Sequence, residues 1–165
     1  MKNFIKALAL VAIMTFVPAA YAVSTPQANA VQAKINAANT AVVSLNSPTL
    51  IVNNPYTYVN KNVEFNAKFN KFSTLGLDYK PAMRASQVYI GVLLERDDVG
   101  SNIIPLSELK MFMKRTYAEK FTDVESGDTV HIKGRVFSAA LGDPWMDITE
   151  MKIISHKNPK PANNK

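Results

Sequence analysis

The sequence predicts a mainly β fold preceded by an N-terminal helix, and three observations support the β assignment. Apolar and polar residues alternate over 63–69 and again over 130–136, which is typical of strands with one buried and one solvated face. Residues 87–94 are nearly all apolar, as expected of a central strand buried on both faces. A last strand is predicted over 145–154, with its phase slipping near Thr149.

Residues 1–22 have the features of a cleavable signal peptide. Two lysines precede an apolar core over 7–17, and Ala20-Tyr21-Ala22 supplies the small residues of a cleavage site, so cleavage is expected before Val23. The alternative is a retained anchor, but a spanning helix needs about 20 apolar residues and this core is shorter. We therefore expect a periplasmic or secreted mature protein.

A helix is predicted over 25–44, within an N-terminal helix and linker assigned to 23–56. Thr25 suits an N-cap and Pro26 the first helical position. A thin apolar stripe follows at helical spacing: Val31, Ile35, Ala38 and Val42. Such a stripe could pack against the body, pair with another helix or act as a tether.

The next elements are predicted from changes in the spacing of apolar residues along the sequence. A strand from Asn62 requires a bulge near Phe72, because this ring is out of phase with Phe69. A long loop is expected over 73–86 and a turn over 97–101. The stretch 106–121 fits either one helix or a strand to about Arg115 followed by a helix from Thr116 to Thr122, and we prefer the second reading.

The segment AEKFTDVESGDTVHIKGRVFS, from Ala118 to Ser138, resembles the helix, turn and fourth strand of exported bacterial OB-fold domains of the anticodon-binding-like group. Gly127-Asp128 and Lys133-Gly134-Arg135-Val136 carry the resemblance. It implies a five-stranded OB-like Greek-key barrel over 57–155, with a short helix between strands 3 and 4. The basic tail over 156–165, rich in Pro, Asn and Lys, is predicted from its composition to be disordered. Gly134 would let the barrel close at a corner. The predicted inward residues are Val63, Phe65, Ile90, Val92, Val130, Ile132 and Val136.

The most distinctive loop, ending in Gly142-Asp143-Pro144-Trp145, lies between the last two strands. OB domains usually have one of their two ligand loops at this position. Trp145, the only tryptophan, could be a stacking platform for a base or sugar ring. The alternative, which we prefer, is a stiff turn in which Trp145 covers one end of the barrel.

A second group of candidate ligand contacts combines basic and aromatic residues. The long loop carries Tyr79, Lys80 and Arg84, and by alternation the strands point Lys68, Lys133 and Arg135 outward. Interleaved basic and aromatic side chains can follow a polyanion. However, strands normally carry lysines on their solvated face, and this is the preferred reading.

The net charge of the predicted folded body does not favour a polyanion as the ligand. The whole chain has a net charge of +6, from 19 basic and 13 acidic residues. The body over 23–155 holds 14 of the basic and all 13 acidic residues, which leaves +1. Nucleic-acid binding requires a basic footprint, so the high pI, which comes mostly from the two ends of the chain, does not provide one.

No catalytic, metal or cofactor motif is recognisable. His131 and His156 are isolated, there is no cysteine, and Asp143, Asp147 and Glu150 lack the spacing of a calcium loop. No nucleophile motif or phosphate loop is present. We therefore expect a non-enzymatic module of the bacterial envelope that contacts a protein or a glycan, with nucleic-acid binding as the alternative.

Overall fold

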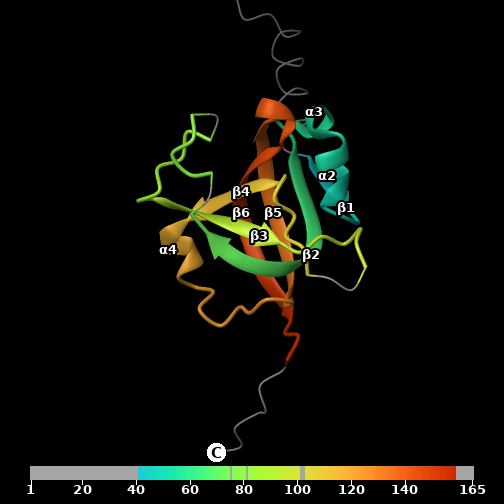
Figure 1. Cartoon of the computed structure of the whole chain (residues 1–165), viewed down its shortest axis with the longest axis vertical. Helices are drawn as coiled ribbons and strands as arrows, with labels where there is room; N and C mark the ends of the chain where they lie inside the picture. Colours follow the sequence, from blue (N-terminus) through green and yellow to red (C-terminus); the bar gives the residue numbers. More distant parts are fainter. Residues whose placement is uncertain (1–40, 75, 81, 101–102, 159–165) are drawn as a thin grey trace, which may run out of the picture.

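The longest strand of the computed structural model, β2 (Asn62–Ser73), pairs with β1, β3 and β5 (Figure 1). The structure describes residues 41–74, 76–80, 82–100 and 103–158. Within these residues, no helix is long and apolar enough to cross a membrane. The other elements are β1 (Val42–Leu45), α2 (Thr49–Asn53), α3 (Pro55–Tyr58), β3 (Tyr89–Leu94), β4 (Lys110–Lys114), α4 (Arg115–Ala118), β5 (Thr129–Ser138), the 3₁₀ helix η1 (Ala140–Gly142) and β6 (Trp145–Ser155).

The strands close into a ring. The sheet order is β1-β2-β3-β4-β6-β5, and β2 also pairs with β5, so β2, β3, β4, β6 and β5 form a closed circuit. The β4–β6 and β1–β2 pairs are parallel and the others antiparallel. The helix α4 lies between β4 and β5 in the chain. This mainly β, five-strand ring resembles an OB fold, as the sequence predicts.

A bulge in β2 lets one strand serve two neighbours. Residues 62–68 pair with β5, whereas residues 69–73 pair with β3, with a register shift between Phe69 and Lys71. The rings of Phe69 and Phe72 meet edge to face with centroids 5.0 Å apart, and both pack in the main core. The predicted bulge is confirmed, and it bends the strand while keeping both rings inside.

A second irregularity lies where β5 contacts β6. The register shifts immediately before Gly134, close to the predicted phase slip at Thr149. A Cβ on Gly134 would lie 2.3 Å from the backbone oxygen of Asp147. Any side chain would therefore push the two strands apart, so their close approach requires glycine here.

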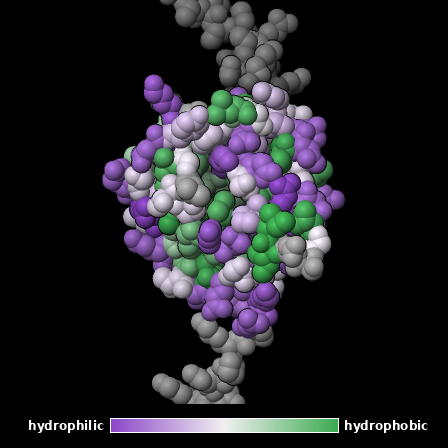
Figure 2. Space-filling model, viewed as in Figure 1, coloured by the Kyte–Doolittle hydropathy of each residue, from purple (hydrophilic) through white to green (hydrophobic). Residues whose placement is uncertain are grey.

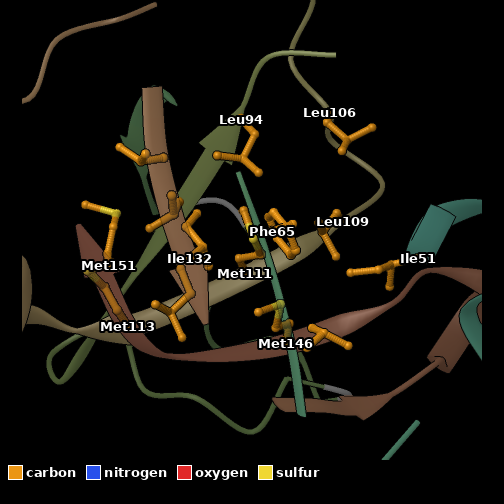
Figure 3. Close-up of a cluster of buried hydrophobic side chains, with 14 of the residues drawn as sticks. Ile51, Phe65, Leu94, Leu106, Leu109, Met111, Met113, Ile132, Met146 and Met151 are labelled. Carbon is orange, nitrogen blue, oxygen red and sulfur yellow. The ribbon is translucent and has the colours of Figure 1, made fainter. Parts of the chain in front are cut away.

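Aliphatic, methionine and phenylalanine side chains fill the ring (Figure 3). Of the residues predicted to point inward, six are buried and Ile90 is partly buried against the same core. The side chains labelled in Figure 3, each at most 2% exposed, are Ile51, Phe65, Leu94, Leu106, Leu109, Met111, Met113, Ile132, Met146 and Met151. The inward phase of the predicted strands is thus confirmed.

The predicted N-terminal helix over 25–44 is wrong where the structure describes it. Residues 25–40 lie outside the described part, but Val42–Leu45 forms β1, in parallel register with Asn62–Phe65 of β2. Two successive valines suit a strand, and pairing with an edge of β2 outweighs the helical pattern. The expected linker instead contains α2 and α3, and Ile51 of α2 is fully buried in the main core.

The ambiguous stretch over 106–121 forms a strand followed by a helix, as preferred, although α4 ends at Ala118, before the predicted Thr122. Tyr117 ties α4 to the ring. Its hydroxyl accepts a hydrogen bond from the Met151 N–H at 3.0 Å and donates one to the Met151 carbonyl at 3.3 Å. The ring of Tyr117 also packs edge to face on Phe121.

A buried carboxylate fixes the chain beyond β6. Asp128 is 1% exposed and accepts hydrogen bonds from the N–H groups of Glu125 and Lys157, at 2.9 and 2.8 Å, and from His156 Nδ1 at 2.8 Å. Burial raises the pKa of Asp128, but these hydrogen bonds outweigh burial and hold the pKa below its ordinary value. The tail predicted to be disordered over 156–165 therefore begins with bonded residues, and 159–165 lie outside the described part.

Replacing this carboxylate, Asp128→Asn, should lower the free energy of unfolding at pH 7 by about 1.5–3 kcal/mol, as expected for lost charge-assisted hydrogen bonds. Because the folded pKa is depressed, the stabilisation is present above the unfolded pKa of about 3.9 and is lost as the pH falls through the folded pKa. The free energy of unfolding, measured by urea denaturation at a series of acidic pH values, should therefore fall more steeply for the wild type than for Asp128→Asn as the pH is lowered. Parallel pH profiles would contradict this role.

Candidate functional site

Two loops meet on the outer face of β3 and β4. Residues 74–88 join β2 to β3, and residues 139–144 join β5 to β6. Between the loops, Trp145, Phe112 and Ala82 form a small second core cluster, separate from the main core. Aromatic packing therefore holds together two loops that are far apart in the sequence.

Trp145 is the centre of this cluster. Its side chain is 2% exposed, and its Nε1 donates a hydrogen bond to the carbonyl of Ala140 at 3.0 Å. The rings of Tyr79 and Phe112 stack on it, with centroids 5.9 and 6.0 Å away and interplanar angles of 21° and 26°. A tryptophan that is buried and hydrogen-bonded in this way fits a cap better than an open platform for a ligand.

Arg84 fastens the first loop to β6. Its Nε donates to Asp147 Oδ1 at 2.8 Å, and a second guanidinium nitrogen pairs with the other carboxylate oxygen. The guanidinium lies 4.4 Å from the centre of the Phe137 ring. The hydrogen bond to Asp147 raises the pKa of Arg84. Arg84, predicted as a ligand contact, is thus occupied by internal partners.

A cleft of ≈ 330 Å³ opens beside this cluster, and we call it the loop cleft. Its floor is largely apolar, whereas Lys110 and Asp143 form an ion pair at 3.2 Å in its lining. The Lys110 ammonium also donates to the carbonyl of Ser107. The lining residues are Ser73, Gly76, Tyr79, Gly91, Val92, Leu93, Ser107, Leu109, Lys110, Met111, Phe112, Leu141, Asp143 and Trp145.

Leu141, in the second loop, is both exposed and strained. It is 76% exposed and lines the loop cleft. Its φ of 62° lies in the left-handed region, which costs a residue with a side chain roughly 1–2 kcal/mol. The sequence singled out the hexapeptide from Ala140 to Trp145, but not Leu141 within it. A leucine between an alanine and a Gly-Asp-Pro turn, where polar residues are usual, is the signal that could have found it.

The predicted site residues fall into separate groups. Trp145, Asp143 and Tyr79 line the loop cleft, and Lys80 is exposed on the same loop as Tyr79. Three others lie elsewhere. Lys133 pairs with Glu64 at 3.1 Å, Arg135 donates to the side chain of Asn60 at 3.3 Å, and Lys68 lines a different cleft.

The comparisons with known proteins are distant. No protein-family model and no curated protein matches the chain. Among solved structures, a chain described as an aspartyl-tRNA synthetase from Leishmania major Friedlin is similar, with 10% identity, a TM-score of 0.44 and 70% of this chain covered. This chain spans 21% of that synthetase. An OBody bound to hen egg-white lysozyme is similar with 14% identity, a TM-score of 0.40 and coverage of 60% of this chain and 86% of the OBody.

Removing the central ring, Trp145→Ala, should lower the free energy of unfolding by about 3–5 kcal/mol, because the ring is fully packed and hydrogen-bonded. Tyr79→Ala is the matched control. Its ring stacks on the same tryptophan but is 47% exposed, so its removal should cost much less. Guanidinium denaturation measures both. A Trp145→Ala protein as stable as the wild type would show that this ring is not a structural cap.

Proposed function

We propose that this chain is an exported, non-enzymatic binding module that contacts another protein of the bacterial envelope through the loop cleft. The observation that carries the proposal is the exposed, left-handed Leu141 beside an apolar cleft with an aromatic floor. Strained residues persist where the surrounding structure enforces them, and they cluster at binding sites. Export rests on the predicted signal peptide over residues 1–22.

A protein partner suits the chemistry of this cleft. Protein interfaces are commonly organised around a few apolar or aromatic anchors in desolvated pockets, with polar groups at the rim. Here Leu141 and the partly exposed ring of Tyr79 offer anchors, and the Lys110–Asp143 pair offers polar contacts. The volume of ≈ 330 Å³ is small, which suits one or two side chains of a partner.

A polyanion is less suited to this surface. Lys110, the one cation among the described residues that line the loop cleft, is paired with Asp143 at 3.2 Å. Nucleic-acid binding needs free cations that can displace counterions along the backbone. Trp145, the ring that the sequence offered as a platform for a sugar, is buried.

In-cell photo-crosslinking tests the proposed interface. A photo-crosslinking amino acid replaces Leu141 in the full chain, which is expressed in bacterial cells. The control places it at Ile154, which is 57% exposed at the end of β6 and outside the loop cleft. We expect position 141, but not position 154, to crosslink to a defined protein of the envelope. The crosslinked chain should begin at Val23. Labelling of glycan or nucleic acid, or equal capture from both positions, would contradict the proposal.

The captured protein, once purified, is then titrated with Leu141→Asn. Asparagine tolerates the left-handed region, so the free energy of unfolding should stay equal or rise. Binding should weaken by at least about tenfold, as expected of an apolar anchor. Ile154→Asn should bind as the wild type does. Unchanged affinity of Leu141→Asn would exclude the loop cleft as the interface.

A further inference from the structure

One methionine differs sharply in exposure from the others in the described part of the chain. Met83, in the loop that joins β2 to β3, is 83% exposed, the highest fraction among the exposed large apolar side chains of the described residues. The sequence has no cysteine, so methionine is its only sulfur-bearing residue type. The other described methionines lie in the main core and are each at most 2% exposed: Met111, Met113, Met146 and Met151.

Hydrogen bonds fix the backbone on both sides of Met83. Its N–H donates to the carbonyl of Tyr79 at 3.2 Å, and its own carbonyl accepts a hydrogen bond from Arg84 at 3.2 Å. Arg84 also donates to the carbonyl of Ala82 at 3.0 Å and forms an ion pair with Asp147 of β6. The backbone at Met83 is therefore tied to the ring as well as to its own loop.

The residue before Met83 takes the inward position in this loop. Ala82 is fully buried and packs with Trp145 and Phe112 in the second core cluster. The φ of Met83 is 47°, in the left-handed region that residues with a side chain rarely adopt. Because Ala82 packs inward and Arg84 holds both carbonyls, the side chain of Met83 is left in solvent. Hydrophilic side chains predominate on the face shown in Figure 2, where hydrophobic ones form separate patches.

The thioether sulfur of methionine reacts with oxidants of the peroxide class. A sulfur lone pair attacks one oxygen of hydrogen peroxide, an S–O bond forms, and the O–O bond breaks. The sulfur loses two electrons and the peroxide gains them, so that the products are methionine sulfoxide and water. An exposed sulfur can react in the native state, whereas a buried one is reached only after local or global opening of the core.

We propose that Met83 is an oxidation site, at which oxidants of the peroxide class form methionine sulfoxide while the four core methionines stay reduced. The product replaces an apolar thioether by a polar, chiral sulfoxide on the surface of the loop. Sulfoxide reductases can restore the thioether, so the modification is reversible. The site goes beyond the proposed function and does not depend on it.

Hydrogen peroxide added in graded amounts to the purified, folded chain tests this site, with peptide mass spectrometry as the measurement. Met83 should gain one oxygen at least about a hundredfold faster than any core methionine, because the core sulfurs react only through opening. In denaturing urea the same five methionines should react at similar rates, because burial no longer protects four of them. Comparable oxidation of Met83 and a core methionine in the folded chain would overturn the proposal.

Matched variants locate the reaction. Met83→Leu should abolish the fast uptake of oxygen by the described methionines, whereas Met151→Leu, which removes a core sulfur, should leave it unchanged. Leu141→Asn should oxidise at the wild-type rate, and no partner is needed, so this test is separate from that of the proposed function. A Met83→Leu chain whose described methionines still take up oxygen at the fast rate would refute the site.

The stability of the oxidised chain gives a second check. Because the Met83 side chain lies in solvent, the chain oxidised at Met83 alone should unfold at the same urea concentration as the reduced chain. A clearly lower urea midpoint would show that this sulfur packs within the fold, which would contradict an exposed oxidation site.

Discussion

Ring closure in this protein depends on one strand making hydrogen bonds to two different partners in succession. Residues 62–68 of β2 pair with β5, and residues 69–73 pair with β3. A straight β2 would keep the same neighbours along its whole length and leave the sheet open, whereas the bulge ends one pairing as the other begins. Gly134 allows the matching close approach of β5 to β6. In the closed ring each of the five strands pairs with two neighbours, and β1 adds a further pairing at Asn62–Phe65 of β2.

The position of the loop cleft follows from this geometry. The loop cleft lies over the outer face of β3 and β4, where Trp145 and Arg84 fix the flanking loops through buried or ion-paired contacts. Because these anchors are already satisfied, the large apolar side chains that the two loops leave exposed are Tyr79, Met83, Val88 and Leu141.

Sequence patterns predicted the strands and the bulge because local alternation records which side chains face the core, as the phase slip from Phe69 to Phe72 shows. They could not predict β1, whose strand conformation comes from pairing with Asn62–Phe65 rather than from its own period. The candidate site was only partly predictable for the same reason. Arg84 is 63 residues from its partner Asp147, so no local signal marked it as occupied. Leu141 is distinguished by its exposed side chain and its positive φ. Both arise only in the folded loop, so the sequence could not predict them.

Native-state hydrogen exchange of the β2 amides tests the closed ring most directly. If closure is cooperative, amides hydrogen-bonded to β5 and amides hydrogen-bonded to β3 should both exchange only through global unfolding. Their opening free energies should then agree with each other and with the free energy of unfolding measured by denaturant. The account would be contradicted if the amides of residues 69–73 had a far lower opening free energy than those of residues 62–68. That result would mean that β2 and β3 separate on their own and that the sheet is not a closed ring.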